Sequence, residues 1–443
     1  MGSDAGGGRS EVKRRSLRTW LLVTFQQIYY GGLNTQISSR VGVAIIAVCL
    51  IHTLFSWQAR SMYDSSNIEY TWVHKSGVVI PYTGHSLGNS ARQGVNLTYM
   101  HMGMLERLPN GSLAMAFQTS ENYYEGSAEQ HLYWSLSDDE GQSWKAPQVL
   151  VEAEGVPLWS PVLHQEAGRL FLFFARSSRK CRYFDRFRNV VRHSPGGDIV
   201  YITSDNSGGT WTLPQQVLGY DAEDGVPKVV ANKVAVLSNG AWVLPFWREP
   251  GKTCPVVRSK VERSQQVNGS AGVLITGDQG LTWSSYGSLA VEGMDTWLIE
   301  NTLVELSTGP LLQLFRSKVG VIYQSTSRDM GMTWAEPEPT MLPNPDSKFH
   351  LMMLSNGNLV CAYNASPIKR TPLTVALSRD QGQTWKVVAH VEGDPDLQFA
   401  YPTMLEVGGD LWVVYSVMQL HPGLARLVSL GMKVAVLRNF AGR

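Results

Sequence analysis

The sequence predicts an all-β fold, a six-bladed β-propeller preceded by an N-terminal transmembrane helix. Two observations support this prediction. A motif of the form Ser-x-Asp-x-Gly-x-Thr-Trp, or a near variant, occurs five times, each time after a strand-like run, and a long uncharged segment precedes all five copies. The copies end at Trp144, Trp211, Trp283, Trp334 and Trp385. Five copies in register indicate a repeat architecture.

The residue types of the motif suit a tight turn. Its Asp carboxylate can accept backbone N–H bonds, and its Gly supplies the positive φ that such a turn needs. Its Trp covers the neighbouring sheet with a large apolar face. In the second copy Asn206 replaces the acid. We therefore interpret the repeated acids as parts of turns at the outer rim of each blade, and we expect no metal and no cofactor.

The spacing of the motifs predicts the size of a blade. The acid, or Asn206, stands at positions 139, 206, 278, 329 and 380, which gives intervals of 67, 72, 51 and 51 residues. A unit of about 50 residues with insertions in the early copies suits a four-stranded blade. A sixth hairpin without the motif spans residues 401–417, and we expect a strand at about residues 73–82 to pair with it and close the ring.

The N-terminal region predicts a membrane anchor. Residues 41–57 carry no charge and are flanked by Arg40 and Arg60, which is at the short end of what spans a bilayer. Basic residues are concentrated before this segment, so the positive-inside rule predicts a type II protein. The expected domains are a cytosolic tail (1–40), a signal anchor (41–57), a stem (58–72) and a lumenal or extracellular propeller (73–437). A cleaved signal peptide and a transit peptide are the alternatives.

Other features agree with the secretory pathway. Acceptor sequons for N-glycosylation follow the anchor and begin at Asn96, Asn110, Asn268 and Asn364. Of the four cysteines, Cys181 and Cys254 lie in polar insertions, where they form either a disulfide or two free thiols. A formal net charge of +1 gives no reason to expect a nucleic-acid partner.

Charged and aromatic residues at the predicted blade openings are the candidates for a site. Glu300 opens one strand, Arg316 ends its partner strand, Arg370 precedes a third, and Tyr401 opens the sixth unit. An Arg guanidinium matches the geometry of a carboxylate, and a Glu can take the proton of a Tyr that acts as nucleophile. These four residues could converge on one anionic sugar.

With these repeats and these four residues, roughly residues 95–420 of the chain resemble the sialidases, and more closely the sialidase-like proteins with Asp-box repeats. The resemblance implies a six-bladed propeller in which three arginines bind the sialic-acid carboxylate, a Tyr–Glu pair supplies the nucleophile and an Asp is the acid/base. On this basis Tyr401 matches the nucleophile and Glu300 its partner. Arg316 and Arg370 match the second and third arginines.

The sequence departs from the family pattern at three places. His101 stands where the first arginine is expected, and Ser160 replaces an Asp. Glu125 stands near the expected acid/base, with Glu129 as the alternative. A His offers one donor to a carboxylate, and its charge depends on pH near neutrality. We therefore expect ordinary sialosides to be cleaved weakly or not at all at neutral pH, with acidic-sugar affinity that improves as the pH falls.

Three functions remain in view. The first is a retaining glycosidase with Tyr401 as nucleophile, Glu300 as its base and Glu125 as acid/base, with Arg316, Arg370 and His101 around an acidic sugar at a glycan terminus. The second is a membrane-tethered propeller that binds carbohydrate without catalysis. The third is a scaffold for protein contacts.

Overall fold

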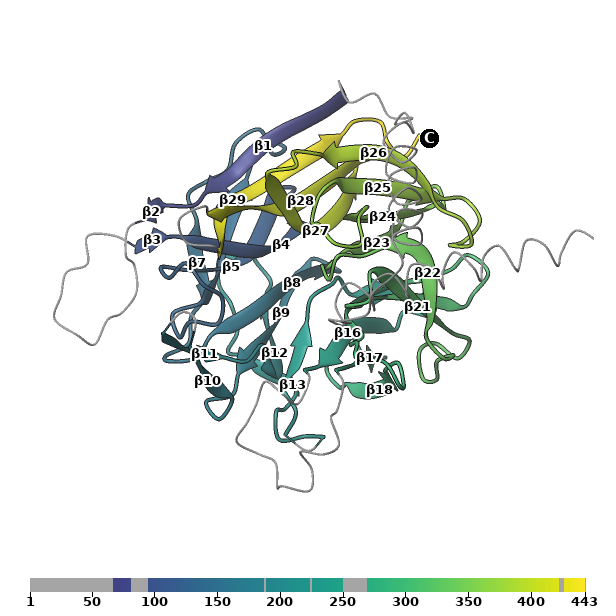
Figure 1. Ribbon diagram of the computed structural model, residues 1–443, viewed down its shortest axis with the longest axis horizontal. Coiled ribbons are helices and arrows are strands. Elements are labelled where there is room, and N and C mark those ends of the chain that lie inside the picture. The colour runs from purple at the N-terminus through teal and green to yellow at the C-terminus, as the bar shows by residue number, and fades with distance from the viewer. Residues whose placement is uncertain are drawn as a thin grey trace, which may run out of the picture.

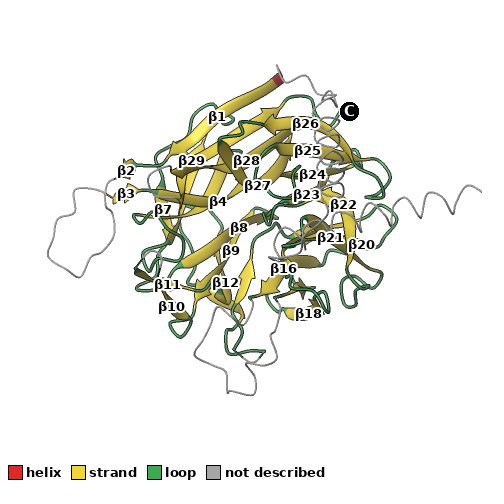
Figure 2. Ribbon diagram, viewed as in Figure 1, coloured by secondary structure: helices red, strands yellow, loops and turns green. Residues whose placement is uncertain are grey.

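The computed structural model describes residues 67–80, 95–186, 189–223, 225–249, 269–421 and 426–442. Beyond one helical residue at Asn67, every regular element in these ranges is a β-strand (Figures 1 and 2). The sheets lie side by side around a common centre, and innermost strands of neighbouring sheets contact one another there. The prediction of an all-β propeller is thus confirmed.

Four sheets contain four antiparallel strands each. In chain order they are β4 (Tyr99–Arg107), β5 (Leu113–Ser120), β6 (His131–Ser137) and β7 (Gln148–Val151); β19 (Ile299–Glu305), β20 (Leu311–Arg316), β21 (Val321–Ser327) and β22 (Glu338–Pro343); β23 (His350–Met353), β24 (Leu359–Asn364), β25 (Leu373–Ser378) and β26 (Lys386–Glu392); and β27 (Leu397–Val407), β28 (Asp410–His421), β29 (Arg426–Leu437) and β1 (Ile68–Lys75). These four sheets correspond to four of the predicted blades.

The chain between the first and second of these sheets forms one nine-stranded sheet. Its strands are β8 (Leu158–Glu166), β9 (Arg169–Ser177), β12 (Gly197–Ser204), β13 (Gln215–Leu218), β14 (Lys228–Val230), β15 (Ala235–Val236), β16 (Trp242–Arg248), β17 (Ser270–Thr276) and β18 (Ser284–Leu289). The short strand β14 pairs with β16 over its whole length and with β12 through Lys228 and Gly197. Because β14 joins both sides, the strand pairing does not confirm the predicted count of six separate blades.

Two hairpins stand apart from the main sheets. They are β2 (Val78–Ile80) with β3 (Val95–Leu97), and β10 (Arg182–Asp185) with β11 (Val190–His193). Cys181, immediately before β10, is fully buried against Tyr220 and is disulfide-bonded, whereas Cys361 in β24 is a buried free thiol. Cys254 lies outside the described residues.

The ring is closed by the N-terminal strand. β1 pairs antiparallel with β29 along its length, so it becomes the fourth strand of the sheet that contains the C-terminal strands. The strand begins at Ile68, five residues before the position expected from the sequence. The inner face of this sheet packs on the first complete sheet, where Met432 and Val434 join a core with Met115 and Phe117. Closure is therefore both a strand pairing and a shared core.

All five motifs lie between the third and the outermost strand of their unit, as predicted. In the copy after β25, the Ser378 hydroxyl donates to Asp380 Oδ1 and accepts the N–H of Gly382. The same carboxylate accepts the N–H and the hydroxyl of Thr384. These bonds hold the pKa of the acids low, at about 2 for Asp139, Asp278 and Asp329. The acids satisfy turn donors, which confirms their structural role.

The motif glycines also bring neighbouring sheets together. Gly208 has a φ of +87°, and a Cβ at this position would collide with the ring of Trp134 in β6 of the adjacent sheet. Gly141, with a φ of +77°, stands in the same way against Trp412 of β28. Only glycine combines the positive φ with this close approach. The motifs therefore fix contacts between sheets as well as the turns themselves.

The predicted N-terminal tail and anchor, residues 1–40 and 41–57, lie outside the described residues. Within the described part of the chain, no helix has the length and apolar character needed to cross a membrane.

Candidate functional site

Four strands that line the centre share an irregularity near their beginning. In β4, β8, β19 and β27 the strand pairing is interrupted and one residue adopts a positive φ. These residues are Met102 (61°), Ser160 (53°), Glu300 (48°) and Tyr401 (57°). A non-glycine residue in this region costs on the order of 1–3 kcal/mol and is typical of functional sites. Two of the predicted site residues, Glu300 and Tyr401, are thus at corresponding places in different sheets.

Buried asparagines hold the neighbouring backbone in place. The Asn232 side chain donates to the carbonyls of Glu300 and Asn301 at 2.9 and 3.0 Å. Asn364 donates to the carbonyl of Phe399, two residues before Tyr401, at 2.9 Å. Each bond joins one unit of the ring to the next, so the packing of the sheets fixes the backbone on which the candidate residues stand.

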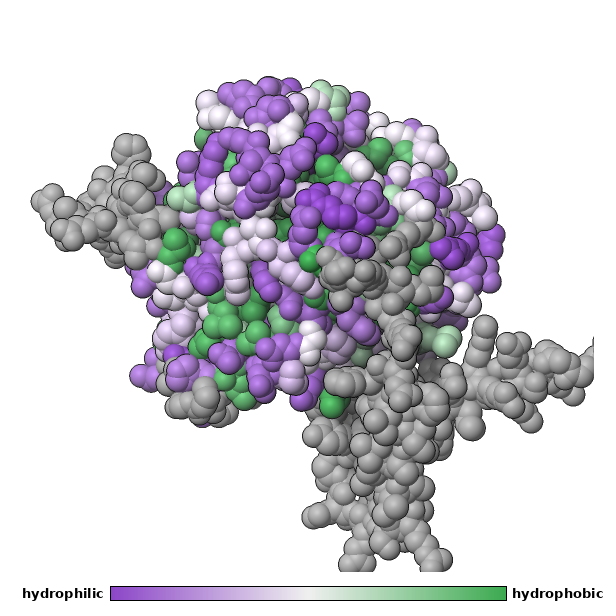
Figure 3. Space-filling model, turned by 90° about the horizontal axis from the view of Figure 1, so that it is seen from above, coloured by the Kyte–Doolittle hydropathy of each residue, from purple (hydrophilic) through white to green (hydrophobic). Residues whose placement is uncertain are grey.

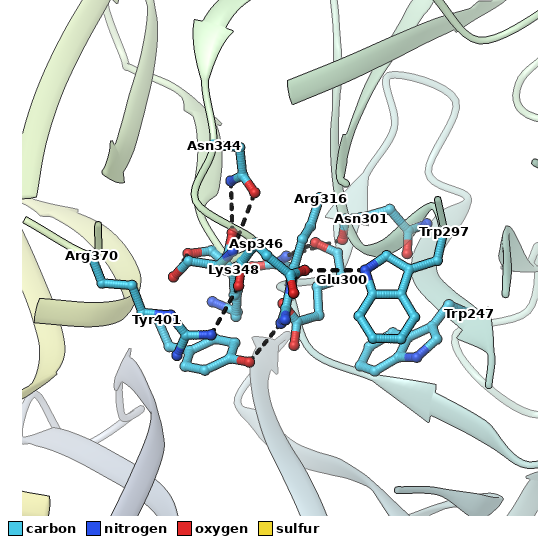
Figure 4. Close-up of polar contacts among 12 residues, drawn as sticks. Trp247, Trp297, Glu300, Asn301, Arg316, Asn344, Asp346, Lys348, Arg370 and Tyr401 are labelled. Carbon is cyan, nitrogen blue, oxygen red and sulfur yellow. Dashed lines mark hydrogen bonds and ion pairs between the residues drawn. The ribbon is translucent and has the colours of Figure 1, made fainter. Parts of the chain in front are cut away.

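Arg316, at the end of β20, joins the candidate catalytic residues (Figure 4). Its Nη1 donates to Glu300 Oε2 at 2.6 Å and to the Tyr401 hydroxyl at 2.6 Å. All three side chains belong to residues that are less than 10% exposed. The Glu300 carboxylate and the Tyr401 hydroxyl therefore meet at one guanidinium nitrogen, although they come from sheets about 100 residues apart in the chain.

Arg370 and His101 lie around the ring of Tyr401. The Arg370 guanidinium is 5.3 Å from the ring centroid, and the His101 ring meets it edge-on with centroids 4.1 Å apart. His101 Nδ1 is 2.8 Å from the Ser416 hydroxyl. The structure thus brings His101, Arg316, Arg370, Glu300 and Tyr401 together, as the sequence predicted.

The titration expected for His101 does not agree with the structure. Burial lowers the pKa of His101 well below its usual value, and the positive charges of Arg370, Lys348 and Arg316 lower it further. The imidazole is therefore neutral across the physiological range. The expected gain of charge on His101 as the pH falls toward 5.5, on which the expected improvement in acidic-sugar affinity depends, is wrong for this buried imidazole.

Glu125 is the better placed of the two carboxylates considered for the acid/base. Its Oε1 accepts the side-chain amide of Gln118 at 2.9 Å, and its charge raises the pKa of Tyr401. Glu129 is exposed and contacts Asn122 instead. Gln118 also accepts the backbone N–H of Ser160, which stands where the family has an Asp. The geometry therefore favours Glu125 over Glu129.

Tyr401 is protonated in this arrangement. Burial raises its pKa above the usual value for tyrosine, while Arg316 and Arg370 oppose the shift and Glu300 and Glu125 add to it. The Tyr401 hydroxyl therefore keeps its proton unless a base removes it, and the Glu300 carboxylate shares the Arg316 guanidinium nitrogen with it.

Three charged residues near this cluster, two of them buried and Asp346 partly exposed, were not predicted from the sequence. Asp346 Oδ1 accepts from Arg316 Nε at 2.8 Å and from the Trp297 indole at 3.1 Å. Lys348 Nζ donates to the carbonyl of Pro402 at 2.9 Å, directly after Tyr401, and burial lowers its pKa to about 7. The signal for Asp346 and Lys348 in the sequence is a polar loop, residues 344–348, ahead of the apolar strand β23.

Glu249 is the third of these residues. It follows β16 directly, is 6% exposed, and its Oε2 accepts from the indole of Trp247 at 2.6 Å. Burial raises its pKa to about 7, and the charges of Glu300 and Glu125 push in the same direction. Among the described residues, no donor contacts its other carboxylate oxygen. A second carboxyl group, poised to titrate near neutrality, therefore stands beside the Glu300–Arg316 pair.

Comparisons with known proteins place this chain in a family. The family model for the BNR repeat-like domain matches residues 111–413. Curated proteins gave no significant match. Among solved structures, a protein of unknown function from Dyadobacter fermentans DSM 18053 is similar at 15% identity and a TM-score of 0.61, over 84% of this chain and 98% of that one.

Sialidases are among the similar structures. The Trypanosoma rangeli sialidase with 2,3-difluorosialic acid as a covalent intermediate has 12% identity and a TM-score of 0.62, over 85% of this chain and 60% of that one. The Hadza microbial sialidase Hz136 has 15% identity and a TM-score of 0.56, over 76% and 65%. This chain thus spans about three-fifths of the trypanosomal sialidase. At these identities the likeness concerns the fold, while the family model covers well over half of the chain. The protein therefore belongs to the family of proteins with a BNR repeat-like domain, and its fold is similar to that of the sialidases.

Proposed function

We propose that the protein is a retaining glycosidase that acts on an acidic sugar at a glycan terminus. The observation that carries this proposal is the meeting of Glu300 and Tyr401 at Arg316 Nη1, each at 2.6 Å. A scaffold protein has no need for a buried Glu and Tyr on strained backbone beside a buried Arg. The covalent intermediate in the trypanosomal sialidase, a structure of the same fold, supports the same class of reaction.

The reaction follows from the groups present. Glu300 takes the phenolic proton as the Tyr401 oxygen attacks the anomeric carbon, and the bond to the leaving group breaks. Glu125 gives its proton to the leaving oxygen. In the second step Glu125 removes a proton from water, which attacks the same carbon and releases Tyr401, and the phenolate recovers its proton from Glu300. Arg316 and Arg370 supply positive charge for the carboxylate of the sugar.

Trapping of the covalent intermediate tests this proposal. The full-length chain is incubated with a 2,3-difluorinated sialic acid and its mass is measured; we expect one added sugar on the wild type and none on Tyr401→Phe. A panel of fluorogenic acidic glycosides then gives kcat, which Tyr401→Phe should lower by at least about 10³-fold. The proposal would be contradicted if no adduct formed and no acidic sugar in the panel were turned over.

Binding without catalysis is the second candidate, and two observations favour it. A neutral His101 stands where the family has an arginine, and Asp346 already occupies Arg316. If the protein binds carbohydrate without catalysis, an acidic sugar should bind the full-length chain, and Tyr401→Phe should leave the affinity for that sugar unchanged. No substrate in the panel should be turned over.

We also propose the topology and the blade count that the sequence predicts. Residues 41–57 anchor the protein with the propeller on the lumenal or extracellular side, and protease digestion of the propeller in sealed microsomes, with the tail spared, would contradict this.

The nine-stranded sheet represents two blades joined by β14, which brings the count to six, because a motif follows both β12 and β17. A crystal structure in which β12 and β16 pair directly as neighbouring strands of one continuous sheet would argue against two blades.

A further inference from the structure

Asp346 is held in place by a rigid loop between β22 and β23. The Asn344 side chain donates to the carbonyl of Ser347 at 2.8 Å and accepts its N–H at 3.2 Å. Asn344, Ser347 and Lys348 are all at most 2% exposed. Asp346 itself has a φ of 54°, a conformation that costs energy for a non-glycine residue. The loop is thus built to present this one side chain at a defined place.

Asp346 contacts both arginines of the site (Figure 4). Its Oδ1 lies 2.8 Å from Arg316 Nε, and its backbone carbonyl accepts from Arg370 Nη2 at 2.8 Å. The Trp297 indole holds the same carboxylate oxygen from the other side at 3.1 Å. The side chain of Asp346 is 40% exposed, whereas that of Arg316 is 9% exposed. Asp346 is therefore the solvent-exposed member of its ion pair with Arg316, whose guanidinium is largely shielded from solvent.

The charge balance of the cluster also depends on Asp346. Burial acts to raise its pKa, but the charge and hydrogen bond of Arg316 outweigh this effect, so that the pKa is lowered and the carboxylate is ionised at physiological pH. Arg316 already carries the carboxylate of Glu300. With Asp346 in place, the two carboxylates that contact Arg316 outnumber its single positive charge, so Arg316 offers an incoming acidic sugar no excess positive charge.

We propose that Asp346 is an internal competitor for the anion site: its carboxylate occupies the position on Arg316 that the carboxylate of an acidic sugar would take, and thereby sets the selectivity of the site. This inference rests on the proposed function for the identity of the ligand. Because Asn344 and Ser347 hold the backbone of the loop, an acidic ligand must turn the Asp346 side chain away and lose the bond to Trp297. A neutral sugar has no such competition.

The test compares Asp346→Asn with the wild type by titration calorimetry on the full-length chain. The probes are acetate, the methyl α-glycoside of N-acetylneuraminic acid and the methyl ester of that glycoside, which lacks the charge. Asn keeps the size of the side chain and its acceptor for Trp297. Asp295→Asn is the matched control, because Asp295 is exposed two residues before Trp297 and loses the same charge.

We expect Asp346→Asn to bind acetate and the acidic glycoside at least tenfold more tightly than the wild type, with the ester unchanged and Asp295→Asn like the wild type. Equal acetate affinity in wild type and Asp346→Asn, or an equal gain in Asp295→Asn, would overturn the inference. A gain for acetate without binding of any acidic sugar would support it and contradict the proposed glycan function instead. Asp346→Ser is the second variant if Asp346→Asn does not fold.

Discussion

At the scale of single residues, Glu249 links the site to the stability of the protein. Its carboxyl group is buried beside Glu300, and its pKa is raised to about 7 from a usual value of 4.5. The folded protein therefore keeps a proton on Glu249 over a pH range in which the unfolded chain has lost it. By linkage, its favourable contribution to folding is complete below about pH 4.5 and is lost as the pH rises through 7.

This linkage predicts a pH-dependent effect of Glu249→Gln. Gln keeps an oxygen acceptor for the Trp247 indole but has no proton to lose. Relative to wild type, the variant should gain stability between pH 5 and pH 8, on the order of 2 kcal/mol. Chemical denaturation at both pH values measures the difference. The same offset between variant and wild type at pH 5 and pH 8 would show that Glu249 does not titrate in this range.

The sequence predicted some residues of the site and missed others. The position of each residue, on a strand or in a loop, explains the difference. Glu300 and Tyr401 lie near the beginning of strands that line the ring, and Arg316 ends the strand that pairs with the strand of Glu300, so the order of these residues along the chain was enough to bring them together. Asp346 contacts Arg316 of another strand, and Glu249 is influenced by the charges of Glu300 and Glu125. Both stand at loop positions whose location depends on how the loops fold. A buried environment also decided the charge of His101, and burial cannot be inferred from a single His in an apolar run.

At the scale of elements, the repeated motif performs two tasks that can be separated by experiment. Gly208 has a positive φ and stands against Trp134 of the neighbouring sheet, whereas Gly168, in the hairpin between β8 and β9, has a similar φ of +84° and open space around it. An added methyl group therefore strains the backbone at both positions and meets a side chain only at Gly208.

We expect Gly208→Ala to lower the free energy of unfolding by about 1–3 kcal/mol more than Gly168→Ala does. Thermal and denaturant unfolding of both variants measure this difference. If the two substitutions cost the same, the motif acts through its turn alone and contributes nothing to the contact between sheets.

The repeat pattern predicted the elements better than it predicted their pairing. Alternation of apolar and polar residues located the hairpins, and the five motifs marked the turn before each outermost strand. The repeat pattern did not reveal that β14 pairs with both β12 and β16. The strand β14 has only three residues, and its pairing with β12 involves the single position Gly197. Such a join depends on how two units meet in space, which leaves no periodic trace in the sequence.

At the scale of the whole molecule, β1 determines whether the ring is closed. Without β1, the edge of β29 would be exposed, and the core shared by the first and last sheets would lose Val73. Val73 is 4% exposed and faces that core, whereas Lys75, on the same strand, is exposed to solvent. An exposed edge of this length is also a site for aggregation.

Val73→Asp should therefore destabilise the entire propeller and not only its first strand. A charge without a partner in this core costs several kcal/mol, about 3 or more. The variant should unfold in one cooperative transition at a lower denaturant concentration, and amides of β29 and β4 should lose protection together in hydrogen exchange. Lys75→Asp places the same group on the exposed part of β1 and should remain close to wild type. Loss of protection confined to β1, with β29 and β4 unchanged, would show instead that the remaining sheets hold the ring together without their N-terminal strand.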